Sequence, residues 1–175
     1  PLFGLPYEFS YIANSKLFDI IPIPVIIVII MAFLVNFLLK NFPFGRYTYA
    51  LGGNFEATRL AGVKVDLQTI KIYSISGIFS GLGGIILASR LSTGQPTAGT
   101  GYELDVIAAC VIGGASLSGG SGTILGAMIG ALIIGILRNG CNLLNISAFW
   151  QQIAIGAIII IDVFVDQYKR KFNKE

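Results

Sequence analysis

Long apolar runs separated by short polar segments dominate the pattern of this chain. The first run, residues 20–39, contains no formal charge. At about 1.5 Å per residue, a helix of that length reaches roughly 30 Å, the thickness of the hydrocarbon core of a bilayer. Similar runs cover residues 69–90, 122–138 and 148–165, and a shorter run covers residues 105–118. The pattern therefore predicts an all-α, polytopic transmembrane helix bundle with about five spans.

The positive charges predict which way these spans cross the membrane. Five Lys or Arg residues flank the loop at residues 40–68, four lie in the tail at residues 166–175, and three remain for the other side. By the positive-inside rule, the loop and the tail face the cytoplasm, whereas residues 1–19 and 91–104 face the outside. If the loop and the tail both face the cytoplasm, an even number of spans must lie between them. Residues 105–118 must then cross as a short or broken span, because a re-entrant dip would place the tail outside. We expect the non-helical backbone of that span to be buried in protein.

One short helix is predicted within the polar loop, at residues 54–61. Asn54 is a suitable N-cap, because its side chain can accept a hydrogen bond from the first turn. Glu56 lies near the positive end of the helix dipole, and Gly62 follows as a left-handed C-cap. A rigid helix joined to two spans can transmit a push from a cytoplasmic partner into the membrane, which a flexible loop cannot do.

Composition supports a lipid environment. The chain is 54% hydrophobic and 12% charged, with a mean hydropathy of +0.78, whereas a soluble domain carries about 25% charged residues. The net charge of +3 clusters beside the apolar spans, so membrane topology explains it better than nucleic-acid binding. The sequence begins with Pro1 and shows no signal-peptide pattern, so we expect a fragment of a longer protein.

The sequence offers little for enzymatic chemistry. It contains no His, and Cys110 and Cys141 match no metal or disulfide spacing. The stretch "GGSGTILG" has its third glycine one residue late for a dinucleotide fingerprint, and the chain has no P-loop pattern. We therefore predict no catalytic residue, no metal site and no cofactor bound by this chain.

Charged side chains near or inside the spans are functional candidates, because charge within a bilayer is unfavourable. Glu103 and Asp105 border a loop, and Asp162 lies close enough to the basic tail to pair with it. Gln151 and Gln152 are polar companions in the last run. Among them, only Asp162 favours the alternative function of a gradient-driven carrier or channel, whereas a membrane-embedded enzyme lacks the necessary residues.

Gly122, Gly126 and Gly130 recur every four residues. Residues at this spacing share one face of a helix, where small side chains let a neighbouring helix approach closely. The repeat predicts tight helix packing.

The segment "FGRYTYALGGNFEATRLAGVKV" resembles the coupling segment of permease subunits from bacterial ATP-binding-cassette importers of monosaccharides. The resemblance continues through "ASRLSTGQPTAGTGYELDVIAACVIGGASLSGGSGTILGAMIGALIIGILRNGCNLL" and covers about Phe44 to Val165. It implies that the chain is part of a sugar translocation path, with ribose or a similar sugar as the substrate. It also implies that the other half of a permease is missing here.

The resemblance implies that residues 54–62, here called the coupling segment, dock into a cleft of a cytoplasmic ATPase. The docking residues are Asn54, Glu56, Ala57, Arg59 and Gly62. Thr58 replaces the alanine that is usual in the family, a difference that can alter which ATPase is accepted.

The remaining partners follow from the same resemblance. They are an extracytoplasmic sugar-binding protein, a second permease subunit, identical or different, and the lipid bilayer. ATP-Mg is expected on the partner ATPase, and the location is the bacterial cytoplasmic membrane with a cytoplasmic C-terminus. The outer loop is expected to contact the translocation path or the binding protein through Gln95, Tyr102, Glu103 and Asp105.

Overall fold

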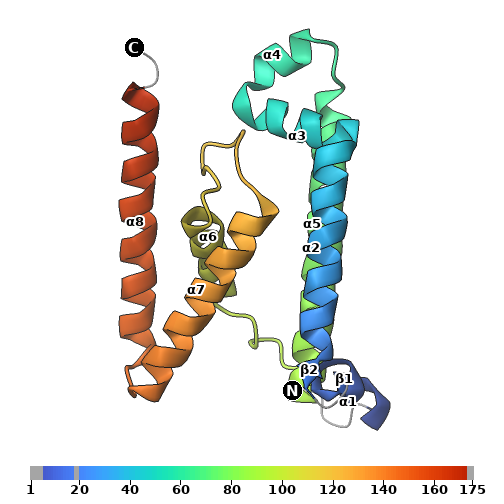
Figure 1. The fold of residues 1–175 in the computed structure, drawn as a ribbon, viewed down its shortest axis with the longest axis vertical. Helices are drawn as coiled ribbons and strands as arrows, with labels where there is room; N and C mark the ends of the chain where they lie inside the picture. Colours follow the sequence, from blue (N-terminus) through green and yellow to red (C-terminus); the bar gives the residue numbers. More distant parts are fainter. Residues whose placement is uncertain (1–5, 18–19, 173–175) are drawn as a thin grey trace. The chain divides into compact units, whose positions relative to one another are not determined.

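The computed structural model describes residues 6–17 and 20–172, and within these ranges the chain forms eight helices and one short hairpin (Figure 1). The all-α prediction is confirmed. Contacts divide the chain into two compact units. The first contains the residues up to Thr48 together with Thr58–Thr100, and the second contains Tyr49–Ala57 together with the residues from Gly101 onward.

The first unit contains two long apolar helices, α2 (Ile23–Asn41) and α5 (Val65–Leu91). Proline is present at the start of α2, where the missing N–H would have no helical partner. The most apolar stretches of α2 and α5 have mean hydropathies of 2.6 and 1.6, respectively. No residue of α2, all of which the structure describes, is buried within the chain. Such a uniformly apolar surface suits lipid or further membrane helices.

A small element covers one end of α5. It consists of helix α1 (Tyr7–Asn14) and a hairpin of β1 (Lys16–Leu17) and β2 (Ile21–Pro22), in which Leu17 faces Ile21. Helix α1 packs against α5 and α2. Ser89 of α5 is fully buried there: its Oγ donates to the carbonyl oxygen of Phe9 (2.6 Å) and accepts from the N–H of Ala13 (3.0 Å).

The polar segment after α2 contains two helices, α3 (Pro43–Gly53) and α4 (Phe55–Leu60). The sequence predicted only the second. Pro43 begins α3, a position that proline favours. The buried side chain of Gln68 in α5 donates to the carbonyl oxygen of Phe44 (2.9 Å) and to Oγ1 of Thr48 (3.0 Å). These bonds hold the first part of α3, which explains why a polar segment without a strong apolar pattern is helical.

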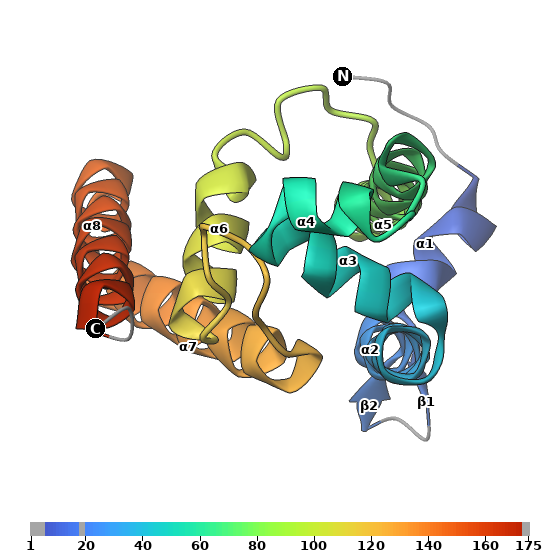
Figure 2. The same ribbon diagram turned by 90° about the horizontal axis from the view of Figure 1, so that it is seen from above.

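The second unit is built around α6 (Tyr102–Ile112), which packs against both α7 (Ile124–Leu143) and α8 (Ala148–Phe172) (Figure 2). Its core is small and apolar, with Ala108 at 0% and Ile155 at 2% exposure. The remaining members are Ala109 and Ile134. Alanine at the centre lets the three helices approach closely.

The helices differ in whether they are long enough to cross a membrane. Among residues 6–17 and 20–172, three helices are long and apolar enough to cross a bilayer: α2, α5 and α7. Helix α8 is continuous to Phe172, with a shorter apolar part at Ala148–Ile161, and the side chain of Asp162 lies outside the described residues. At 11 residues, α6 covers only roughly 17 Å. It is followed by residues 113–123, here called the glycine loop, so the stretch at residues 105–118 combines a short helix with irregular backbone.

The predicted glycine face of α7 is partly wrong. Gly126 and Gly130 lie on α7 against the backbone of α6, where an added Cβ at Gly126 would strike the carbonyl group of Gly113. Gly122 does not share that face, because α7 begins only at Ile124. Thr123 is its N-cap, accepting a hydrogen bond from the N–H of Gly126 (3.0 Å), and Gly122 precedes it with a φ of 155°. Because the helix begins after the threonine cap, only the second and third glycines of the repeat are on the helix.

Candidate functional site

The coupling segment is a short helix with a defined cap at each end. Oδ1 of Asn54 accepts a hydrogen bond from the N–H of Ala57 (2.9 Å), and the N–H of Asn54 donates to the carbonyl oxygen of Ala50 in α3 (2.9 Å). At the other end, Gly62 has a φ of 83° and donates its N–H to the carbonyl oxygen of Arg59 (3.0 Å). The predicted N-cap and left-handed C-cap are confirmed. The caps give six helical residues a fixed shape.

Most side chains of this helix point outward. Glu56, Ala57 and Arg59 are exposed. Leu60 is 85% exposed and Phe55 48%. Sequence reasoning did not select these two apolar residues, because an amphipathic pattern cannot be recognised over six residues. These two apolar side chains, at the first and last positions of the helix, are exposed together with one acidic and one basic side chain, a combination that suits burial against a protein partner.

Thr58 differs from its exposed neighbours in this helix. It was predicted to influence which ATPase is accepted, but its side chain is buried, with 6% exposure. Its carbonyl oxygen accepts the N–H of Val63 (3.4 Å), which helps to close the end of the helix. Thr58 is therefore buried in its own chain, and its influence on which ATPase is accepted stays a prediction that would act through the shape of the helix and not through direct contact.

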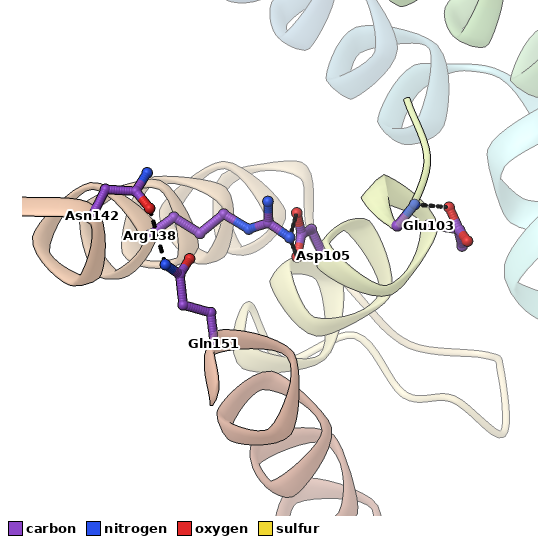
Figure 3. A network of polar contacts seen from close by, with 6 residues as sticks. Glu103, Asp105, Arg138, Asn142 and Gln151 are labelled. Carbon is purple, nitrogen blue, oxygen red and sulfur yellow. Dashed lines mark hydrogen bonds and ion pairs between the residues drawn. The ribbon is translucent and has the colours of Figure 1, made fainter. Parts of the chain in front are cut away.

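A second polar site joins α6 and α7 (Figure 3). Nη2 of Arg138 lies 2.8 Å from each carboxylate oxygen of Asp105. The side chains are 33% and 15% exposed, respectively. The guanidinium carbon of Arg138 also lies 6.0 Å from the ring centroid of Tyr102. Charge-assisted hydrogen bonds of this length are among the strong ones, so the pair fastens the start of α6 to the last part of α7.

Further polar contacts surround this pair. Gln151, at 6% exposure, donates its Nε2 to Oδ1 of Asn142 and to the carbonyl oxygen of Ile146, at 2.9 Å each. It thereby ties the beginning of α8 to the end of α7. Nε of Arg138 is buried and has no hydrogen-bond partner among the described residues. The three helices therefore share one polar region at the ends opposite the glycine loop.

The predicted outer-loop residues are not all brought together. Tyr102 and Asp105 lie beside Arg138, a residue that was not among the candidates chosen from the sequence. Glu103 points away from the pair in Figure 3, and its Oε2 accepts the N–H of Gly101 (3.1 Å). No sequence signal links positions 105 and 138, because their partnership depends on how the two helices pack.

Gln95 belongs to the other unit. Its Nε2 donates to Oγ1 of Thr97 (3.3 Å), and it lines an open cavity of 460 Å³ at the end of α5. Most of the cavity lining is small or apolar, including Gly84, Leu87 and Ala88. The cavity therefore lacks the converging polar groups that recognise a sugar.

Metal chemistry has no candidate site in the part of the chain that the structure describes. No group of three or more His, Cys, Asp or Glu residues there could hold a metal ion. Cys110 and Cys141 are free and half-buried.

Apolar helices long enough to cross a bilayer, closely packed through glycine and alanine, define an integral membrane protein of the helical-bundle class. The chain belongs to the family described as "Branched-chain amino acid transport system / permease component", whose model matches residues 1–163. The resemblance found in the sequence is thus confirmed at the level of a transport-system permease. No solved structure matches the chain.

Similar proteins carry more specific names. The ribose import permease protein RbsC of Haemophilus influenzae is 50% identical over 173 residues, covering 94% of this chain and 54% of the relative. RbsC of Bacillus subtilis is 51% identical over 166 residues, covering 95% and 51%. The L-arabinose transport system permease protein AraH of Escherichia coli is 48% identical over 154 residues, covering 88% and 47%. The chain spans about half the length of these relatives, and all are named as permeases.

Proposed function

We propose that this chain forms part of the translocation path for a monosaccharide, ribose or a similar sugar, in an ATP-driven importer of the bacterial cytoplasmic membrane. Two permease subunits would form the path, and an extracytoplasmic binding protein would deliver the sugar. The relatives that are 48–51% identical to this chain are named as ribose and L-arabinose permeases, which supports a monosaccharide as the substrate. ATP-Mg would be bound and hydrolysed by a separate cytoplasmic subunit.

The observation that carries the coupling role is the exposed, doubly capped helix α4. Its apolar side chains Phe55 and Leu60 are both exposed, and its charged side chains Glu56 and Arg59 are also exposed. A nucleotide can shift a conformational equilibrium only through different affinity for the two states. The ATPase would therefore contact this helix differently before and after it closes on ATP.

The test is crosslinking from the coupling segment. In the complete permease, Cys110 and Cys141 are replaced by serine, and a single cysteine is introduced as Ala57→Cys, an exposed position. We expect a crosslink to the ATPase in membrane vesicles whose yield changes with ATP. A matched variant, Gly77→Cys in the middle of α5, should give none. Absence of any ATPase adduct, despite labelling of Ala57→Cys from the cytoplasmic side, would refute the proposal.

The left-handed C-cap allows a second prediction. Replacing Gly62, which has a φ of 83°, with valine should lower sugar uptake several-fold while ATP hydrolysis continues, because a β-branched residue disfavours this conformation by roughly 1–2 kcal/mol. Gly53→Val is the matched control: both glycines face open space, but Gly53 has no positive φ. Uptake and hydrolysis are measured in proteoliposomes. If both variants keep uptake and hydrolysis in the normal ratio, the cap has no coupling role.

A gradient-driven carrier is the second candidate function. The Asp105–Arg138 pair between α6 and α7 is the observation that favours it, since paired charges within helix bundles can mark ion pathways. Uptake that persists in ATP-depleted vesicles and disappears with a protonophore would support the carrier over the importer.

A further inference from the structure

The second part of α3 makes an unusually close contact with the glycine loop. An added Cβ at Gly52 would lie 2.5 Å from the backbone nitrogen of Gly120 and 3.3 Å from the carbonyl carbon of Gly119. Conversely, an added Cβ at Gly119 would lie 2.7 Å from the carbonyl oxygen of Gly52. Real Cβ atoms do not approach this closely, so only glycine permits this backbone-to-backbone contact.

A hydrogen bond accompanies this contact. The hydroxyl group of Tyr49, one helical turn before Gly52, donates to the carbonyl oxygen of Gly122 (3.0 Å). All of these residues belong to the second unit, which contains the first part of the coupling segment and helices α6 to α8. The helix that leads into the coupling segment is thus attached to the loop between α6 and α7 by a steric contact and a directional bond.

The glycine loop is in turn firmly attached to α6 and α7. Within the loop, the N–H of Ser116 donates to the carbonyl oxygen of Ser121 (3.0 Å), and the N–H of Gly119 donates to that of Ser116 (3.0 Å). At its two ends, the backbone of Gly113 meets that of Gly126 without room for a side chain. Packed backbone has no flexible side chain to absorb a displacement, so a shift of the loop is passed to both helices.

We propose that Tyr49 and Gly52 are the residues through which movement of the coupling segment reaches the glycine loop and so displaces α6 and α7 together. The Asp105–Arg138 pair at the opposite ends of these helices would keep them aligned during that displacement. This inference rests on the proposed function, because it assigns a route to the coupling that the ATPase would drive. Tyr49 and Gly52 are positioning residues and need not touch the ATPase or the sugar.

The first experiment compares Gly52→Ala with Gly53→Ala in the complete permease, assembled with its ATPase and binding protein. The backbone of both glycines lies near the glycine loop, but an added Cβ at Gly53 meets no described atom within 4 Å, whereas one at Gly52 meets the loop. We expect Gly52→Ala to lower the ratio of sugar uptake to ATP hydrolysis by about tenfold. Gly53→Ala should keep the ratio of the unmodified protein.

A milder pair keeps the test decisive if Gly52→Ala fails to fold. Tyr49→Phe removes only the hydroxyl group that bonds to Gly122, and Tyr47→Phe makes the same change at an exposed tyrosine two residues earlier. We expect a several-fold lower ratio of uptake to hydrolysis for Tyr49→Phe alone, with at most a small decrease in thermal stability and unchanged amounts of bound ATPase.

The outcomes separate this inference from the proposed function. If the Ala57→Cys crosslink forms but both test variants keep the ratio of their controls, the ATPase docks as proposed and the route through the glycine loop is wrong. If no crosslink forms, the proposed function fails first. A reduced ratio together with loss of bound ATPase from the test variants would also overturn the inference, because it would show a docking defect instead of a transmission defect.

Discussion

Replacing Gly130 with alanine is expected to push α7 away from α6 and to lower the thermal stability of the second unit severely. An added Cβ at this position would strike the carbonyl oxygen of Ala109 and would lie 2.8 Å from its carbonyl carbon and 3.0 Å from the nitrogen of Gly113. These are backbone atoms of α6, so no side-chain rotation can relieve the conflict. Overpacking of a close contact typically costs about 1–3 kcal/mol, and we expect the upper end of that range.

Gly135 on the same helix provides the matched control. An added Cβ there meets no described atom within 4 Å, so Gly135→Ala should be neutral or slightly stabilising, because alanine favours helix by up to about 1 kcal/mol. Both variants are compared in detergent by the midpoint of thermal unfolding and by the yield of monodisperse protein. Equal midpoints would show that α6 and α7 do not pack through Gly130.

Replacing Asp105 with asparagine is expected to produce the second large effect. The change preserves the shape of the side chain but leaves the guanidinium group of Arg138 without its charged partner, and Nε of Arg138 already lacks a described partner. Removing one partner of a fully buried pair costs about 3–5 kcal/mol. Because Arg138 is one-third exposed, water can compensate in part, and a loss of about 2 kcal/mol is expected.

A double-mutant cycle separates the pair from its individual residues. The variants are Asp105→Asn, Arg138→Gln and the double variant, each compared by thermal midpoint and by transport in the complete permease. The double variant should recover part of the stability that each single variant loses, since neither charge is then unpaired. Glu103→Gln is the control, because Glu103 is an exposed carboxylate whose only partner among the described residues is the backbone N–H of Gly101. Additive losses in the cycle would show that the pair is energetically unimportant.

The sequence predicted the helical elements well where hydrophobicity is a sufficient signal. The apolar runs correspond to α2, α5, α7 and the first part of α8. It failed at α3, whose first part is held by a hydrogen bond from the side chain of Gln68 to Phe44, 24 positions earlier in the chain. Local sequence patterns do not record such a bond, since intrinsic helix propensity is weak compared with tertiary contacts.

The candidate site residues also divide into those that local sequence reveals and those that only the fold reveals. Asn54 and Gly62 could be recognised because helix caps are local features of the chain. Leu60 and Phe55 were missed because only the folded structure shows that they are left exposed. For Thr58, only the folded structure shows that the side chain is buried. Gly122 was expected on the helix, but the helix begins only after the N-cap at Thr123.

The sequence by itself therefore determined that this chain is helical, apolar enough for the bilayer and similar to permeases of sugar importers. Those properties depend on hydropathy over about 20 consecutive residues and on local motifs, both of which are written along the chain. Only the tertiary structure decided that Asp105 pairs with Arg138 and that Gly52 lies against Gly120. Such contacts join residues far apart in sequence, and they exist because helices pack where glycine and alanine allow their backbones to meet.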